Sequence, residues 1–261
     1  MKNGKYESGG MSGAALKILA CCTMLTDHIG HCIIWPLYVE ACVVDGVSMM
    51  GDLEPAGAKA LYVLYAAMRG IGRMAFPVFS FLLVQGFLHT HSMKAYLLRL
   101  VLFAFLSEIP YDLAMSGQIV NMEQQNVMWT LAVGVTALCG LKFAARYRKG
   151  LRQILYAAIM LCAVLATALG MTDGGGAGIL FVFLFYFFPK RNAAFWVSMW
   201  ALLIWMTYFD FPYEIAALSG VIMTDAYNDS RGKTNKYIFY AFYPLHLLLL
   251  AAARMIFGYG L

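Results

Sequence analysis

The stretch KILACCTMLTDHIGH occupies residues 17–31 and lies inside a longer apolar run, residues 14–38. A membrane-spanning helix needs about 20 predominantly apolar residues, and the longer run exceeds that length. The whole chain of 261 residues has a similar character, because AVILMFWYC residues make up 62% of it and charged residues only 13%. An ordinary globular domain holds about 45–50% apolar and about 25% charged residues. These proportions exclude a soluble enzyme, a disordered tail and a fibre, and they indicate a polytopic membrane protein.

Further apolar runs follow along the chain, so we expect an all-α fold, a transmembrane helical bundle of about nine spans, with eight to ten as the range. The expected spans are residues 14–38, 70–90, 95–115, 125–145, 151–170, 176–189, 193–209, 213–226 and 237–257. Residues 60–69 are either an interfacial helix or an extension of the second span. The sequence has no internal repeat and no linker, so we expect a single transmembrane domain over residues 14–261, preceded by a cytoplasmic segment, residues 1–13.

Loop charge gives the expected orientation, because short cytoplasmic loops collect Lys and Arg. Basic residues precede the first span and occupy every second loop thereafter: Lys2, Lys5, Lys94, Lys142, Arg146, Arg148, Lys149, Arg152, Lys190, Arg191, Arg231, Lys233 and Lys236. The alternate loops are acidic or lack Lys and Arg. We therefore expect a cytoplasmic N-terminus and an external C-terminus, and we attribute the net charge of +5 to cytoplasmic loops rather than to a nucleic-acid partner.

Polar residues of several expected spans lie at one depth, in the external half of the membrane. Ionisable side chains are costly within hydrocarbon, so each is a hypothesis for a functional site. This polar layer contains Asp27, His28, Arg73, Glu108, Asp112, Gln124, Gln125, Asn126 and, in an external loop, Asp173. Structural alternatives remain for these residues: Asp27 and Arg73 would also serve as an ion pair that holds two helices together.

His28 is the strongest candidate for catalysis, because a neutral imidazole can accept a proton near physiological pH. The alternative is a histidine that only forms structural hydrogen bonds. Adjacent helical residues diverge by about 100°, so a residue from another helix is expected to orient His28, and we predict Glu108 for this role. No set of His and Cys residues completes a metal site, and we predict no metal.

Lys17 precedes His28 by eleven residues, close to three helical turns, so both side chains project from nearly the same face. Such a face suits an extended donor with an anionic head in the cytoplasm, of which acyl-CoA is an example. The alternative is a lysine that extends to lipid headgroups. Pro244 interrupts the last span, and His246 is the second histidine candidate, either for the reaction or for hydrogen bonding to the broken helix.

At these residues the sequence resembles the TraX family of conjugal-transfer membrane proteins. The matching elements, in order along the chain, are KILACCTMLTDHIGH, IGRMAFPVFSFLLVQGFLHT, RLVLFAFLSEIPYDLA, QNVMWTL, DGGGAGIL and NKYIFYAFYPLHLLLL. The resemblance implies N-terminal acetylation of pilin with acetyl-CoA as donor. The sequence is also similar to the wider membrane acyltransferases, including the acyltransferase-3 group, whose Arg/Lys-x10-His motif Lys17 and His28 match.

The resemblance and the polar layer together give the expected site. The expected catalytic residues are His28, Glu108, Asp27 and Asn126; the donor-side residues are Lys17, Arg73, Arg99, Arg146 and His246; and Asp173 lies on the acceptor side. We expect an acetyltransferase in the bacterial inner membrane that uses acyl-CoA and an external amine or hydroxyl acceptor. A transporter or flippase and a non-catalytic envelope-assembly protein remain the alternatives.

Overall fold

The computed structural model describes residues 10–44, 47–48, 55–209 and 215–258. Residues 1–9 of the expected N-terminal segment and the beginning of the expected span 213–226 therefore lie outside the described residues. The chain divides into two compact units, residues 1–79 with 211–260, and residues 80–210. Each unit is described by itself, and the single domain expected over residues 14–261 stays a prediction.

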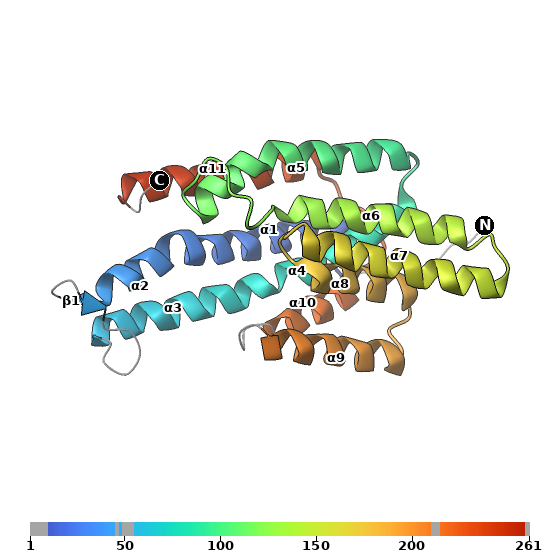
Figure 1. The fold of residues 1–261 in the computed structure, drawn as a ribbon, viewed down its shortest axis with the longest axis horizontal. Helices are drawn as coiled ribbons and strands as arrows, with labels where there is room; N and C mark the ends of the chain where they lie inside the picture. The colour runs from blue at the N-terminus through green and yellow to red at the C-terminus, as the bar shows by residue number, and fades with distance from the viewer. Residues whose placement is uncertain (1–9, 45–46, 49–54, 210–214, 259–261) are drawn as a thin grey trace. The chain divides into compact units, whose positions relative to one another are not determined.

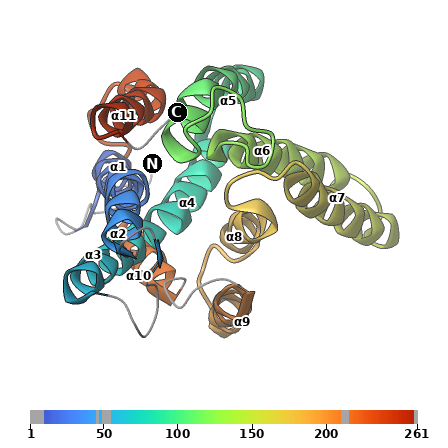
Figure 2. The ribbon, with the colours of Figure 1, turned by 60° about the vertical axis from the view of Figure 1, so that its left-hand side comes forward.

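The first unit is built around three long helical segments (Figures 1 and 2). Its elements are α1 (Gly13–Ile29), the π-helix η1 (Gly30–Ile34), α2 (Trp35–Ala41), β1 (Val43–Val44), β2 (Val47–Ser48), α3 (Ala56–Arg73), the first turn of α4 (Ala75–His89), α10 (Ala217–Met223), the 3-10 helix η3 (Thr224–Ala226) and α11 (Lys236–Ile256). The β1–β2 hairpin is antiparallel and returns the chain, so that α3 packs along α1, η1 and α2. On another side, α11 packs against α1 and η1.

The second unit is a series of apolar helices, each packed against the next from α5 to α9. It contains the rest of α4, then α5 (Met93–Met115), α6 (Val127–Ala144), α7 (Lys149–Leu169), α8 (Gly175–Phe187) and α9 (Ala193–Phe209). Buried side chains such as Leu138 of α6 and Phe181 of α8 fill the space between these helices. In the α8–α9 turn, the Arg191 guanidinium lies 5.1 Å from the ring centres of Phe185 and Phe195, which places a cation against aromatic faces.

Polar residues determine where several helices begin. Ser12, Ser92, Asn126 and Asn235 each accept a hydrogen bond from the first turn of α1, α5, α6 and α11, respectively. Such caps satisfy amide groups that have no partner within the helix. These four helices begin within two residues of the expected spans, and the expected all-α character is confirmed apart from the short hairpin.

The second expected span, 70–90, has a different boundary in the structure. The helix begins at Ala56, ends at Arg73, and continues as α4 after a break at Met74. Residues 60–69 therefore extend this segment, which was one of the two alternatives.

Among the described residues, five helical segments are long and apolar enough to cross a membrane: Gly13–Ala41, Gly57–His89, Val127–Ala144, Lys149–Leu169 and Tyr237–Ile256. The apolar helices of α8, α9 and α10 with η3 are shorter. Helix α5 has 23 residues but carries Lys94, Arg99, Glu108 and Asp112. The expected count of about nine spans and the cytoplasmic N-terminus stay predictions.

Candidate functional site

The helix that contains His28 changes its winding directly after it. The backbone N–H of Trp35 bonds to the carbonyl of Gly30, five residues earlier, which defines the π turn η1. Pro36 explains this turn, because proline has no N–H to donate and its ring clashes with the carbonyl four residues before it. A single π turn accommodates an extra residue without ending the helix. The segment from α1 to α2 is thus one continuous rod with His28 just before the wider turn.

His28 of α1 and His246 of α11 meet inside the first unit. The Nδ1 atom of His28 lies 2.8 Å from Nε2 of His246, and the two rings are nearly parallel, 7° apart. Both residues are buried, with exposed fractions of 6% and 4%. The Nδ1 atom of His246 lies 2.8 Å from the carbonyl oxygen of Phe242, one turn earlier on α11. His246 therefore contacts both the histidine of the other helix and the backbone of its own.

The hydrogen-bond partners indicate which ring nitrogens of His28 and His246 carry protons when both rings are neutral. A carbonyl oxygen can only accept, so Nδ1 of His246 carries a proton and donates it to Phe242. In a neutral imidazole the other nitrogen is an acceptor, so Nε2 of His246 accepts a hydrogen bond from Nδ1–H of His28. The lone pair of His28 is then on Nε2, which has no hydrogen-bond partner among the residues described. This arrangement leaves one oriented nitrogen lone pair in a buried setting.

Asp27, next to His28 on α1, binds a different helix, α3. Its Oδ2 atom forms an ion pair with Nη1 of Arg69 at 2.5 Å. Gly72 of α3 allows this approach, because a Cβ atom at that position would overlap Cβ, Cγ and Oδ1 of Asp27. Sequence reasoning considered Arg73 as the partner and missed Arg69, which it placed before the second span. The signal was present in RGIGR, residues 69–73, where two arginines one turn apart flank two glycines.

Lys17 and Arg73 belong to the same unit as the histidine pair. The ammonium group of Lys17 lies 5.5 Å from the ring centre of Phe239, so α1 and α11 also meet at this level. Arg231 is close enough to Lys17 for an electrostatic interaction. Arg69 and Arg73 are likewise electrostatic neighbours of His28. Of the residues expected on the donor side, His246 and Arg73 lie near His28, and Lys17 lies about three turns before it on α1.

Glu108 and Asn126 lie in the second unit and form a hydrogen-bonded network with Trp129. The Glu108 carboxylate accepts bonds from Nδ2 of Asn126 at 2.6 Å, from Nε1 of Trp129 at 2.7 Å and from the backbone N–H of Asn126 at 3.2 Å. Asn126 also donates to the carbonyl of Ala104 and accepts from the N–H of Met128. These bonds join α5 to the start of α6. In the first unit, His246 contacts Nδ1 of His28. The prediction that Glu108 orients His28 stays a prediction.

Asp173 joins the loop between α7 and α8 to α6. Its backbone N–H donates to Gln125, and its carbonyl accepts from the Thr130 hydroxyl, which also bonds to Thr172. These backbone contacts fix the loop. The acceptor-side role expected for the Asp173 side chain stays a prediction.

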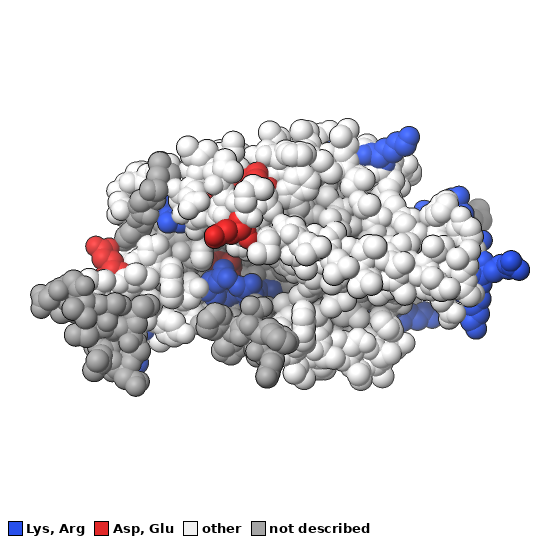
Figure 3. All heavy atoms as spheres, in the orientation of Figure 1, with Lys and Arg blue, Asp and Glu red and all other residues white. Residues whose placement is uncertain are grey.

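The two remaining donor-side residues also lie in the second unit. Arg99 is on α5, and the guanidinium of Arg146 lies 5.6 Å from the ring centre of Phe143 after α6. Figure 3 shows Lys and Arg gathered where α6 and α7 are joined, and the sequence there contains Lys142, Arg146, Arg148, Lys149 and Arg152.

The comparisons with known proteins give the family. The family model described as TraX protein matches residues 12–254, nearly the whole chain. The chain belongs to the TraX family. The matched region contains both histidines of the pair, Asp27 with Arg69, and the Glu108 network.

One curated relative has a name that refers to pilus formation. The probable fimbrial assembly protein FimC, serogroup H1, of Dichelobacter nodosus is 26% identical over 213 residues, which cover 73% of this chain and 84% of the relative. No solved structure matches the chain. The relationship with the acyltransferase-3 group stays a prediction. Among the described residues, no group of three or more His, Cys, Asp or Glu side chains is arranged to hold a metal.

Proposed function

We propose that this protein is an integral membrane acyltransferase that moves an acetyl or short acyl group from acyl-CoA to an amine or hydroxyl acceptor. The observation that carries the proposal is the chain of contacts from the Phe242 carbonyl through His246 to His28, which leaves the lone pair on Nε2 of His28. Membership of the TraX family, which is associated with pilin acetylation, supports the same activity. Acetylation of a pilin N-terminus, with acetyl-CoA as donor, is the example that the family implies.

The proposed reaction is a direct transfer at Nε2 of His28. The acceptor amine or hydroxyl attacks the thioester carbonyl carbon, and Nε2 of His28 takes its proton at the same time. A bond from the acceptor to the acyl carbon forms, the carbon–sulfur bond breaks, and the CoA thiolate receives the proton from His28. His246 holds the His28 ring and stabilises its protonated form by accepting the Nδ1 proton in a hydrogen bond. A third group to orient His28 is therefore unnecessary.

The charged groups of the first unit are assigned supporting roles in the proposal. Arg73, one turn after Arg69 on α3, stabilises the oxyanion that develops on the thioester carbonyl. Asp27 neutralises Arg69 and holds α3 against α1 at the level of His28. The anionic head of the donor is assigned to basic side chains, of which Lys17 is in register with His28, and Arg99 and Arg146 lie in the second unit.

The proposed location is the bacterial inner membrane with the N-terminus in the cytoplasm, because basic residues occupy every second loop of the sequence. The donor then enters from the cytoplasmic side and the acceptor from the external side. A non-catalytic assembly protein is the second candidate, since the relative from Dichelobacter nodosus is named a fimbrial assembly protein.

The test is thioester cleavage by purified protein in nanodiscs, supplied with acetyl-CoA and a panel of peptide, amine and sugar acceptors. Wild type is compared with His28→Ala and with His91→Ala, a matched control at an exposed histidine. We expect acceptor-dependent release of CoA from wild type and His91→Ala, and a loss of at least about 100-fold in His28→Ala. Equal rates for His28→Ala and wild type, or no cleavage by folded wild type with any acceptor, would reject the proposal.

A further inference from the structure

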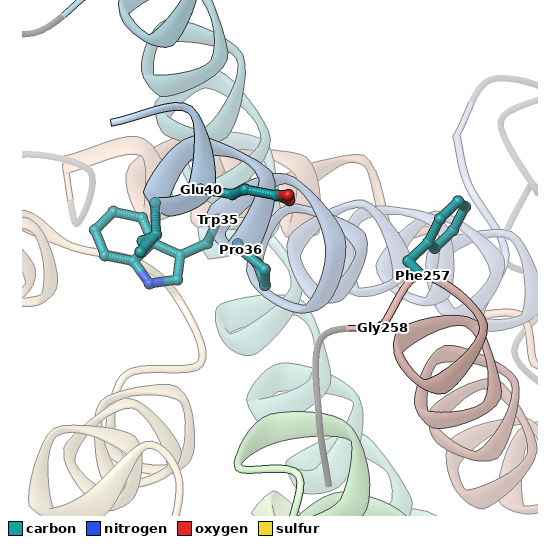
Figure 4. A pocket seen from close by; sticks show the side chains of 6 residues that line it. Trp35, Pro36, Glu40, Phe257 and Gly258 are labelled. Atoms are coloured by element: carbon teal, nitrogen blue, oxygen red, sulfur yellow. The ribbon is translucent and has the colours of Figure 1, made fainter. Parts of the chain in front are cut away.

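A pocket opens beyond the histidine pair, between α2 and the end of α11. Its volume is about 450 Å³, and it is lined by Trp35, Pro36, Val39, Glu40, Phe257 and Gly258. All six residues belong to the first unit. Figure 4 shows the Glu40 carboxylate directed away from Trp35, toward the side of the pocket on which Phe257 lies.

The pocket has the chemistry of a site for an organic cation. Among the described side chains that line the pocket, Glu40 is the charged one, and no cationic side chain of the described residues forms an ion pair with it. The Phe257 ring is 60% exposed. A carboxylate beside an accessible aromatic face suits an ammonium or guanidinium group, because the ring face is negative and apolar at once.

The pocket is in register with the histidine pair along both helical segments. Phe257 follows His246 by eleven residues, which is close to three turns, so the two share a face of α11. Glu40 follows His28 by twelve residues, and the π turn η1 absorbs one of them, so Glu40 also lies about three turns beyond His28. Both sites lie along the same two helical segments, and they are about 17 Å apart along the helix axes.

We propose that this pocket binds a basic side chain of a polypeptide acceptor and so selects which acceptor is acylated at His28. An extended chain advances about 3.4 Å per residue, so 17 Å correspond to about five residues. The recognised Lys or Arg lies four to six residues from the acylated amine. This inference rests on the proposed function for the identity of the reacting group, whereas the binding of a cation does not depend on it.

Binding of two peptides to protein in nanodiscs without acetyl-CoA tests the pocket independently of catalysis. The peptides are ten residues long, have a free N-terminus, and differ only in Lys or norleucine at the fifth residue. We expect wild type to bind the Lys peptide about tenfold more tightly. Glu40→Gln removes this preference, and Glu40→Lys transfers it to a peptide with Glu at the fifth residue. Glu123→Gln, at an exposed acid of the second unit, is the control and keeps the wild-type preference. Equal affinity of wild type for both peptides, or a Lys preference retained in Glu40→Gln, overturns the inference.

A second series, with the lysine moved from the second to the ninth residue, tests the spacing through the rate of acetyl transfer. A maximum at the fourth to sixth residue is expected in wild type and in the control Glu123→Gln, and it should disappear in Glu40→Gln. A transfer rate that does not depend on the lysine position rejects the proposed role of the pocket but not the acyltransferase activity. A Glu40-dependent preference in binding, without any transfer by wild type, rejects the acyltransferase and leaves the pocket intact.

Discussion

The two buried polar clusters of this protein differ in how completely their hydrogen bonds are satisfied. Glu108 in the second unit accepts three hydrogen bonds from Asn126 and Trp129, and Asn126 is itself fully buried and bonded at both ends of its amide. In the first unit, His28 uses Nδ1 to bond with His246, whereas its Nε2 atom has no partner among the described residues. A saturated cluster stabilises a fold, and a cluster with one oriented lone pair is available for chemistry.

The difference follows from physical chemistry. A carboxylate within a helical bundle is stabilised by donors around it, and each bond that satisfies it reduces its readiness to accept a further proton. A neutral histidine pair needs no counter-charge, since one ring donates to the other. The pair can remain buried while one nitrogen stays open. Under the proposed function, catalysis belongs to the first cluster and stabilisation to the second.

The largest expected effect is the coupling of the two histidines. His28→Gln should lower acyl transfer by about 100-fold or more, and His246→Gln by about 10- to 100-fold, because the ring of His28 loses its support. The double variant should be no slower than His28→Gln alone, since residues that act as one unit are not additive. Transfer rates of the four proteins in nanodiscs measure this cycle. If the rate loss of the double variant equalled the product of the two single losses, the histidines would act independently. That result would contradict their action as one unit.

The second prediction concerns Glu108. Glu108→Ala leaves Nδ2 of Asn126 and Nε1 of Trp129 without their acceptor, and we expect a loss of about 2–4 kcal/mol in stability. Thermal unfolding in detergent is the measurement, and Glu123→Ala, an exposed acid of the following loop, is the control. Transfer per folded molecule should stay near the wild-type value. Normal stability with abolished transfer would return Glu108 to the catalytic role that the sequence suggested.

The third prediction compares two glycines of α3. Gly72→Ala places a methyl group where Asp27 lies and should cost about 1–3 kcal/mol, with slower transfer because α1 moves with its His28. Gly70→Ala is the matched control, since its Cβ would meet nothing within 4 Å, and it should stabilise the helix by about 0.5–1 kcal/mol. Thermal unfolding and transfer rates distinguish the two. Equal behaviour of the variants would show that the close approach of α3 to Asp27 is unimportant.

The helices could be predicted from the sequence because their signals are local. Apolar runs of sufficient length mark α1, α6, α7 and α11, and Ser or Asn caps stand near the expected ends. The sequence of residues 60–69 fits either an interfacial helix or an extension of the second span, because Lys59 and Arg69 interrupt the apolar pattern. The register of the π turn was also beyond prediction, since Pro36 reveals a distortion but not which carbonyl is skipped.

The candidate site was predicted as a list of residues but not as a set of contacts. His28 and His246 were both named, yet their meeting depends on the packing of helices 218 residues apart in the chain. Depth in the membrane placed Glu108 and His28 in one layer, and depth is all that span counting provides. Which polar groups are satisfied depends on the rotation of each helix about its axis. The hydrophobic pattern of a buried helix, apolar on all sides, contains little information on this rotation.

The smallest expected effect concerns the hydrogen bonds that hold the α7–α8 loop in the second unit. We expect these bonds to contribute to stability and not to acyl transfer. The Thr130 hydroxyl contacts the Asp173 carbonyl and the Thr172 hydroxyl, so Thr130→Val removes bonds between α6 and the α7–α8 loop. We expect a loss of about 1 kcal/mol and unchanged transfer. Thr136→Val is the matched control and should cost less, because among the described residues the Thr136 hydroxyl donates to the carbonyl of Ala132 on its own helix. Thermal unfolding measures both variants. If Thr130→Val instead reduced transfer at normal stability, the loop with Asp173 would belong to the acceptor site and the contrast between the two clusters would fail.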